Sequence, residues 1–168
     1  QPNHEPSMTA RILLVAIVLF VLVAVSGQAR AFDTTAREAI LIEVETGTVL
    51  LEKNSQEITF PSSMTKLMTI YLLFERLAEG SLSLTDTLPV SEKAWRMGGS
   101  KMFVEVDTDV TVEDLIRGIV VQSGNDATIV VAEGLAGSED AFARLMTDKA
   151  REMGIMATSF QNASGWPD

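Results

Sequence analysis

Two short motifs contain the side chains whose types and spacing suit covalent catalysis. Ser63 precedes Lys66 by three positions, and a Ser-Gly-Asn triplet follows at 123–125. A serine hydroxyl becomes a nucleophile when a neighbouring base removes its proton, and a lysine amine is such a base once its pKa is lowered. The sole histidine, His4, lies in the N-terminal tail, which excludes a Ser-His-Asp triad. The pattern therefore predicts acyl transfer that depends on a lysine base.

Helix geometry is expected to bring Ser63 and Lys66 together in the first turn of a helix. Residues at i and i+3 of a helix face each other, with Cβ atoms about 5–6 Å apart. Burial and the positive N-terminal end of a helix both lower the pKa of a lysine. The backbone N–H of Ser63 would be one of the helix's unpaired donors, so it can face a developing oxyanion. These features predict Ser63 as nucleophile and Lys66 as general base.

The second motif is expected on a turn after a helix end, where short polar side chains can face a cleft. A hydroxyl at Ser123 can relay a proton to a leaving amine, and the amide of Asn125 can hold a substrate amide through one donor and one acceptor. Either motif alone is weak evidence, since Ser-x-x-Lys occurs by chance in many helices and Ser-Gly-Asn is ordinarily a turn. Their occurrence together, at two helix ends of one chain, is a much stronger indication.

The elements that must position these motifs begin with a hairpin and a long apolar helix. Strands are predicted over residues 39–44 and 48–52, with a turn between them. A helix is predicted over residues 64–77, with Ser62 as its N-cap. Its apolar residues lie on nearly every face, which is typical of a buried central helix.

Downstream of residue 80 the pattern is mainly helical. Residues 81–110 are expected to be irregular, and the C-terminal residues 158–168 to form a strand and a turn. Three helices are predicted between these segments: 111–121 with Thr111 in a capping box, 126–136, and 139–153 with Ser138 as N-cap and Gly154 at C′. A two-stranded hairpin is marginal by itself. We therefore predict an α/β (α+β) domain in which a helical cluster accompanies an incomplete antiparallel sheet, with further strands beyond residue 168.

Composition excludes several classes of function. The net charge of −10 argues against nucleic acid as a partner, because nucleic-acid binding requires clustered Lys and Arg. Cysteine is absent, so neither disulfides nor thiolate metal sites can form. No group of His, Asp and Glu has zinc-ligand spacing. We therefore expect no metal and no other cofactor.

The N-terminal region has the layout of a secretory signal peptide. Residues 12–25 are fourteen uncharged apolar residues, fewer than the roughly 20 of a membrane-spanning helix. Arg11 precedes them, and Ala29-Arg30-Ala31 forms a small-x-small cleavage site. We predict that residues 1–31 are upstream residues and a signal peptide cut after Ala31, and that residues 32–168 act in the periplasm. The alternative is an uncleaved membrane anchor.

Several sequence blocks resemble those of the low-molecular-mass penicillin-binding proteins, the D-alanyl-D-alanine carboxypeptidases. Residues 61–69, PSSMTKLMT, closely resemble the PASMTKLMT block of that family, and residues 122–127, QSGNDA, resemble its second block. The similarity extends through residues 99–103, 112–118 and 137–142, and it covers residues 32–168 as a whole. The same motif set, with a third block Lys-Thr-Gly, is known in this class of serine enzymes.

The resemblance implies a β-lactamase/transpeptidase-like fold and a serine enzyme that removes the terminal D-alanine from peptidoglycan pentapeptides ending in D-Ala-D-Ala. It implies Ser63 as the acyl-enzyme nucleophile, Lys66 as general base, Ser123 as proton relay and Asn125 as a ligand of the substrate amide. Trp95 and residues 98–103 would border the cleft. β-Lactams would be covalent inhibitors.

Two features of the family are missing from this sequence: the Lys-Thr-Gly block and a C-terminal amphipathic anchor that would contact the inner membrane. We expect residues 32–168 to be the N-terminal part of a longer catalytic domain and to be inactive alone. One alternative is a non-catalytic secreted module that binds peptidoglycan or penicillin. A β-lactamase is disfavoured, because no Glu-x-x-Leu-Asn element follows Asn125.

Overall fold

The computed structural model describes residue 8 and residues 34–167. The chain forms two compact units, with the boundary between Ile58 and Thr59. The predicted signal peptide and its cleavage site lie outside the described residues. Within the described part of the chain, no helix combines the length and apolarity needed to cross a bilayer.

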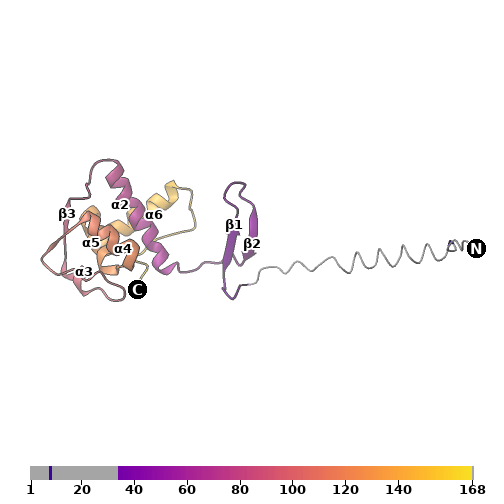
Figure 1. Cartoon of the computed structure of the whole chain (residues 1–168), viewed down its shortest axis with the longest axis horizontal. Coiled ribbons are helices and arrows are strands. Elements are labelled where there is room, and N and C mark those ends of the chain that lie inside the picture. Colours follow the sequence, from indigo (N-terminus) through magenta and orange to yellow (C-terminus); the bar gives the residue numbers. More distant parts are fainter. Residues whose placement is uncertain (1–7, 9–33, 168) are drawn as a thin grey trace, which may run out of the picture. The chain divides into compact units, whose positions relative to one another are not determined.

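The N-terminal unit contains the predicted hairpin (Figure 1). Strand β1, Ala39–Ile42, pairs antiparallel with β2, Val49–Lys53, and the register shifts between Leu41 and Ile42. Gly47 takes a positive φ of 72° in the connecting turn, a conformation that costs glycine little. The carboxylate of Glu43 accepts backbone N–H bonds within the same turn. The hairpin prediction is confirmed, with a first strand shorter than expected.

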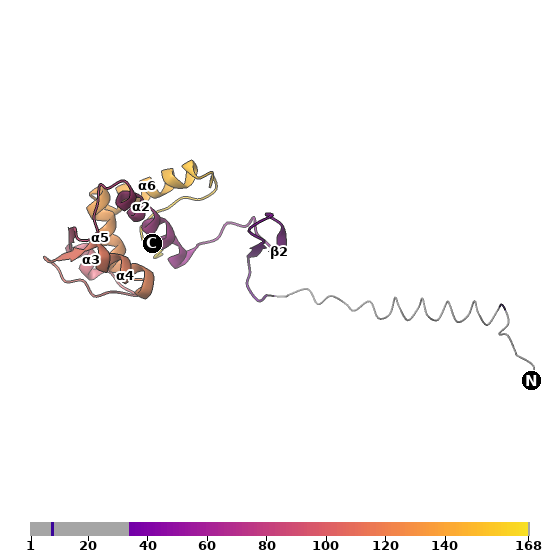
Figure 2. The ribbon, with the colours of Figure 1, turned by 45° about the horizontal axis from the view of Figure 1, so that its top comes forward.

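The C-terminal unit is a helical cluster around α5 (Figures 1 and 2). Its elements in chain order are η1 Ser62–Thr65, α2 Lys66–Ala78, β3 Thr87–Pro89, α3 Glu92–Arg96, β4 Asp109–Thr111, α4 Val112–Gln122, α5 Asn125–Ala136 and α6 Glu139–Glu152. Every residue from 125 to 132 is buried, and α5 packs against α2, α3, α4 and α6. The buried central helix is therefore α5.

The prediction that α2 is buried on all sides is wrong for the described residues. Met68, Leu72 and Leu73 face the core, whereas the side of Leu67 and Phe74 remains open. Leu67 is 73% exposed and Phe74 is 48% exposed. Apolar residues on two faces of a helix show that both faces can pack against other segments. They do not show which segment packs against the second face.

Local capping signals correctly predicted the helix ends of α4 and α6. The hydroxyl of Thr111 accepts the N–H of Asp114, and that of Ser138 accepts the N–H of Ala141. Gly154 ends α6 with a φ of 82°. The assignment of Ser62 as an N-cap is wrong. Ser62 has a φ of 50° and lies inside η1, a 3-10 turn that precedes α2 and carries no side-chain cap.

Two segments differ from the sequence prediction. The region expected to be irregular contains α3 and a second small sheet, in which Leu88 of β3 lies opposite Val110 of β4. Three-residue strands are too short to show an alternating pattern. The predicted C-terminal strand does not form, and residues 155–167 contain neither helix nor strand. The backbone N–H of Phe160 donates to Thr147 Oγ1, 2.9 Å away, so a side chain rather than a neighbouring strand satisfies it.

Candidate active site

The serine and the lysine of the first motif are in direct contact. Ser63 is the second residue of η1, and Lys66 is the first residue of α2. Side chains at i and i+3 of a 3-10 turn are eclipsed, so this turn aligns the two residues. Lys66 Nζ lies 3.1 Å from Ser63 Oγ and donates a hydrogen bond to it. The predicted contact is confirmed.

Lys66 is a buried amine. The residue is only 5% exposed to solvent. Its Nζ also donates a hydrogen bond to the carbonyl oxygen of Ser164, 3.0 Å away. Desolvation by burial lowers the pKa of Lys66 below the usual 10.5. The lysine is therefore held beside the serine in an environment that makes its neutral, proton-accepting form easier to reach than it is in water.

The second motif forms the turn between α4 and α5, as predicted. Ser123 is the C-cap of α4 in a left-handed conformation, with a φ of 55°. Asn125 is the first residue of α5 and is 4% exposed. Its Nδ2 donates to the carbonyl oxygen of Gly98 at 2.9 Å, and its backbone N–H donates to that of Ser100 at 2.8 Å. These bonds to the 98–100 loop use one of the two N–H donors of the Asn125 amide.

A cavity of about 230 Å³ brings Ser63 and Asn125 together. Eight residues line it: Ser62, Ser63, Ser100, Asn125, Ser164, Gly165, Trp166 and Pro167. Lys66 is not among the lining residues, but its Nζ is hydrogen-bonded to two of them, Ser63 and Ser164. Ser123 is not part of the lining, and within residues 34–167 no hydrogen bond joins its hydroxyl to Ser63 or Lys66. Trp95, expected at the border of the cleft, is also outside this lining.

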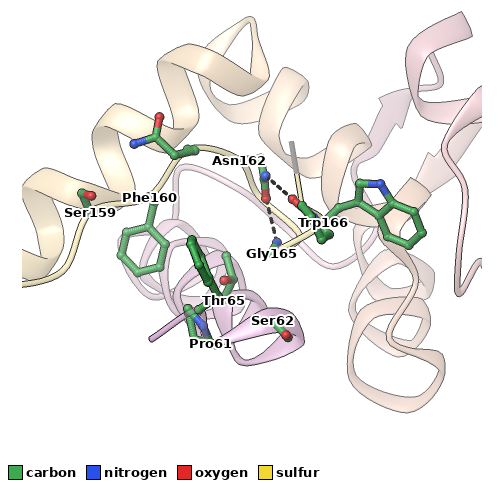
Figure 3. Close-up of a pocket in the computed structure, with 11 residues that line it drawn as sticks. Pro61, Ser62, Thr65, Ser159, Phe160, Asn162, Gly165 and Trp166 are labelled. Carbon is green, nitrogen blue, oxygen red and sulfur yellow. Dashed lines mark hydrogen bonds between the residues drawn. The ribbon is translucent and has the colours of Figure 1, made fainter. Parts of the chain in front are cut away.

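The C-terminal turn was predicted from the sequence, but its position as one wall of the cavity was not. Gly165 has a φ of 77°, and a Cβ there would lie 1.8 Å from the carbonyl oxygen of Ser62. Trp166 packs against Gly99, where an added Cβ would lie 2.4 Å from the indole ring. A second cavity of about 380 Å³ shares Ser62 and residues 165–167 with the first and is also lined by Pro61 and Phe160, among others (Figure 3). The Asn-x-x-Gly spacing at 162–165 is the sequence signal for such a turn.

A structural role for Asp126 was also not predicted from the sequence. Its carboxylate is fully buried and accepts the backbone N–H bonds of Met102, Phe103 and Val104 at 3.0, 2.8 and 3.2 Å. Phe103 has a φ of 65°, an uncommon conformation for a bulky residue. The carboxylate thus fixes the loop that carries Ser100 against the start of α5.

Comparisons with known proteins show the family to which the chain belongs. Residues 24–168 match a family model described as D-alanyl-D-alanine carboxypeptidase. The chain is 45% identical over 130 residues to the D-alanyl-D-alanine carboxypeptidase DacF of Bacillus subtilis, covering 77% of this chain and 33% of the relative. It is 39% identical to DacC of Escherichia coli, with 77% and 34% covered. The chain thus spans about a third of the length of these relatives.

Solved structures give the same result for the fold. The D-alanyl-D-alanine carboxypeptidase DacD from Francisella tularensis matches with a TM-score of 0.78 and 38% identity, covering 82% of this chain and 33% of that one. Penicillin-binding protein D2 from Listeria monocytogenes, in its ampicillin-bound form, matches with a TM-score of 0.70 and 27% identity, covering 79% and 53%. The predicted α/β fold class is confirmed, and the chain belongs to the D-alanyl-D-alanine carboxypeptidase family of penicillin-binding proteins.

Proposed function

We propose that the full-length protein containing this chain is a serine-type D-alanyl-D-alanine carboxypeptidase. Its substrate is the peptidoglycan stem pentapeptide, from which it removes the terminal D-alanine. The observation that carries this proposal is the contact between the buried amine of Lys66 and the hydroxyl of Ser63, at 3.1 Å. Membership of the family supports the substrate class.

In the proposed reaction, neutral Lys66 accepts the proton of Ser63 as the serine oxygen attacks the carbonyl carbon of the penultimate D-alanine. A C–O bond forms, and the carbonyl oxygen becomes an oxyanion that the backbone N–H of Ser63 can stabilise at the start of the helical segment. Collapse of this intermediate breaks the C–N bond, and the proton passes to the leaving amine. D-Alanine departs, and water then hydrolyses the Ser63 ester.

Asn125 and Ser123 have supporting roles in this proposal. The Asn125 amide, which lines the same cavity as Ser63, binds the substrate backbone amide. Ser123 relays the proton to the leaving amine. Because the Ser123 hydroxyl is not hydrogen-bonded to Ser63 or Lys66 in this structure, the relay requires a rotation of its side chain or a bridging water.

A fluorescent penicillin and a D-Ala-D-Ala peptide together test the proposed function. The full-length protein should form one covalent penicillin adduct, mapped by peptide mass spectrometry to Ser63, and should release free D-alanine from the peptide. Labelling without release of D-alanine would indicate a non-catalytic penicillin-binding module. Rapid hydrolysis of the penicillin would indicate a β-lactamase. Either outcome would contradict the proposal.

We expect acylation by penicillin to depend on pH through Lys66. The ammonium form cannot accept the serine proton, so the rate rises with pH through the pKa of this lysine. Burial lowers that pKa, so the pH at which the acylation rate is half-maximal should be lower than 10.5. Lys66→Arg, which stays protonated, should slow acylation by roughly a hundredfold or more. Lys149→Arg on α6 is the matched control, and an equal loss in both variants would contradict a specific base role.

We also propose that the protein is exported to the periplasm and acts on cell-wall peptidoglycan. The support is the apolar run 12–25 with its Ala-x-Ala end. N-terminal mass spectrometry of protein from the natural host should find Phe32 as the first residue. Retention of residues 12–25 would instead indicate a membrane anchor.

A further inference from the structure

The side chain of Asn162 organises the turn that ends the described chain. Its Oδ1 accepts the backbone N–H of Ser164 at 3.2 Å and that of Gly165 at 2.7 Å. Its Nδ2 donates to the carbonyl oxygen of Trp166 at 2.7 Å. Figure 3 shows the side chain at the centre of the turn, bonded to Gly165 and Trp166. One amide therefore ties together three successive residues.

The same turn carries the Ser164 carbonyl to Lys66. Ser164 is 1% exposed, and its carbonyl oxygen accepts the 3.0 Å bond from Nζ. The backbone of Ala163 also anchors the turn. Its carbonyl oxygen accepts a hydrogen bond from Thr69 Oγ1 at 2.7 Å, and its N–H donates to Glu139 Oε1 at 3.0 Å. These bonds place the segment against α2 and α6, whereas Asn162 sets the bend that directs the next carbonyl.

A fixed carbonyl has a specific effect on a neutral amine. The neutral amine of Lys66 has two N–H donors and one lone pair, and it can rotate freely about the terminal Cε–Nζ bond. When one N–H is committed to the Ser164 oxygen, rotation about the terminal C–N bond is restricted, and the lone pair can be held toward Ser63 Oγ, 3.1 Å away. Catalytic efficiency depends steeply on such alignment.

We infer that Asn162 is a positioning residue for the general base: it holds the Ser164 carbonyl so that the Lys66 amine faces Ser63. This inference rests on the proposed function, because it assigns Asn162 to the acylation step. Asn162 does not touch the reacting atoms, and its effect passes through the backbone of residues 164–165. Loss of its side chain should therefore slow the chemical step rather than weaken the initial binding of a ligand.

The test measures acylation of the full-length protein by a fluorescent penicillin in a stopped-flow instrument, across a range of pH. Asn162→Ala should lower the rate constant at the alkaline plateau by roughly tenfold to a hundredfold. The dissociation constant of the non-covalent complex and the final labelled fraction should stay close to those of the wild type. Gln161→Ala is the control, since this neighbouring side chain is exposed, and its plateau should be unchanged.

Asn162→Asp provides a readout that a merely structural role would not give. Aspartate keeps an acceptor oxygen for the N–H groups of Ser164 and Gly165 but loses the donor to the Trp166 carbonyl oxygen, so the alkaline plateau should lie between those of the wild type and Asn162→Ala. Its negative charge near the amine favours the ammonium form, so the half-maximal rate should move to higher pH. A plateau as low as that of the alanine variant would overturn the inference.

The remaining outcomes separate the two proposals. If the wild-type protein is not acylated, the proposed function fails and this inference fails with it. If the wild type is acylated and Asn162→Ala reaches the same plateau rate, only the inference is overturned. If Asn162→Ala yields no folded protein, Asn162→Ser decides, because a hydroxyl caps the turn more weakly than an amide. An unchanged plateau in Asn162→Ser would then overturn the inference, and a reduced one would support it.

Discussion

A protein with alanine in place of Ser63 is expected to bind no penicillin covalently and to release no D-alanine. The variant lacks the Oγ atom that would form the ester. Lys66 Nζ, which lies 3.1 Å from this oxygen in the wild type, then has no proton to accept. Gel fluorescence after exposure to a fluorescent penicillin measures the first effect, and an assay for free D-alanine measures the second. The loss should be complete, since a missing nucleophile cannot be compensated by binding.

Ser62→Ala is the matched control for this experiment. Ser62 lines the same cavity, but its partner three positions on is Thr65 rather than a lysine. Its hydroxyl also caps no helix, so its removal should leave labelling largely intact. Labelling that survives in Ser63→Ala, or disappears in Ser62→Ala, would show that the nucleophile has been assigned to the wrong residue.

Asp126→Ala is expected to remove a large part of the folding stability of the C-terminal unit. The change leaves three backbone N–H groups without their carboxylate acceptor: that of Val104, which is buried, and those of Met102 and Phe103, which are partly buried. An unpaired buried donor costs about 1–3 kcal/mol and a partly buried one costs less, so the three together cost roughly 3–5 kcal/mol. The whole stability of a domain is about 5–15 kcal/mol. Urea unfolding of the full-length protein, followed by circular dichroism, measures the change.

Two other substitutions make this prediction specific. Asp126→Asn keeps one acceptor oxygen but turns an NH₂ group toward backbone donors, so its loss of stability should be intermediate. Asp148→Ala removes an exposed carboxylate that pairs with Arg151 on the surface of α6, where an ion pair contributes about 0–1 kcal/mol. Equal losses from Asp126→Ala and Asp148→Ala would contradict the role given to the buried carboxylate.

Features that depend on local spacing could be predicted from the sequence. The contact between Ser63 and Lys66 depends on a separation of three residues, and the caps at Thr111 and Ser138 depend on N–H groups within the same turn. The turn at Ser123 follows from the glycine at 124, which interrupts two helical patterns. In each case the side chain and its partner lie within one turn of chain, so the spacing contains the relevant information.

Features that depend on distant partners could not be predicted. Asp126 reads as an acidic residue in the first turn of a helix, yet its partners lie more than twenty positions upstream. The apolar residues of 64–77 predicted that this helix is the buried central one, and only tertiary packing shows that α5 occupies that position and that α2 is half-exposed. Residue types define which groups need a partner, but long-range packing selects that partner.

The bond from Lys66 to the Ser164 carbonyl has a consequence for the order in which the site can mature. The two residues are 98 positions apart. At a synthesis rate of about 5–20 residues per second, the carbonyl emerges from the ribosome roughly 5–20 seconds after the lysine. During that interval the nascent chain has the serine and the lysine without the wall that buries the amine, and an exposed lysine keeps its proton at neutral pH. We therefore expect Ser63 to be unreactive during elongation and to become reactive only when the turn at residues 162–166 has packed against Lys66.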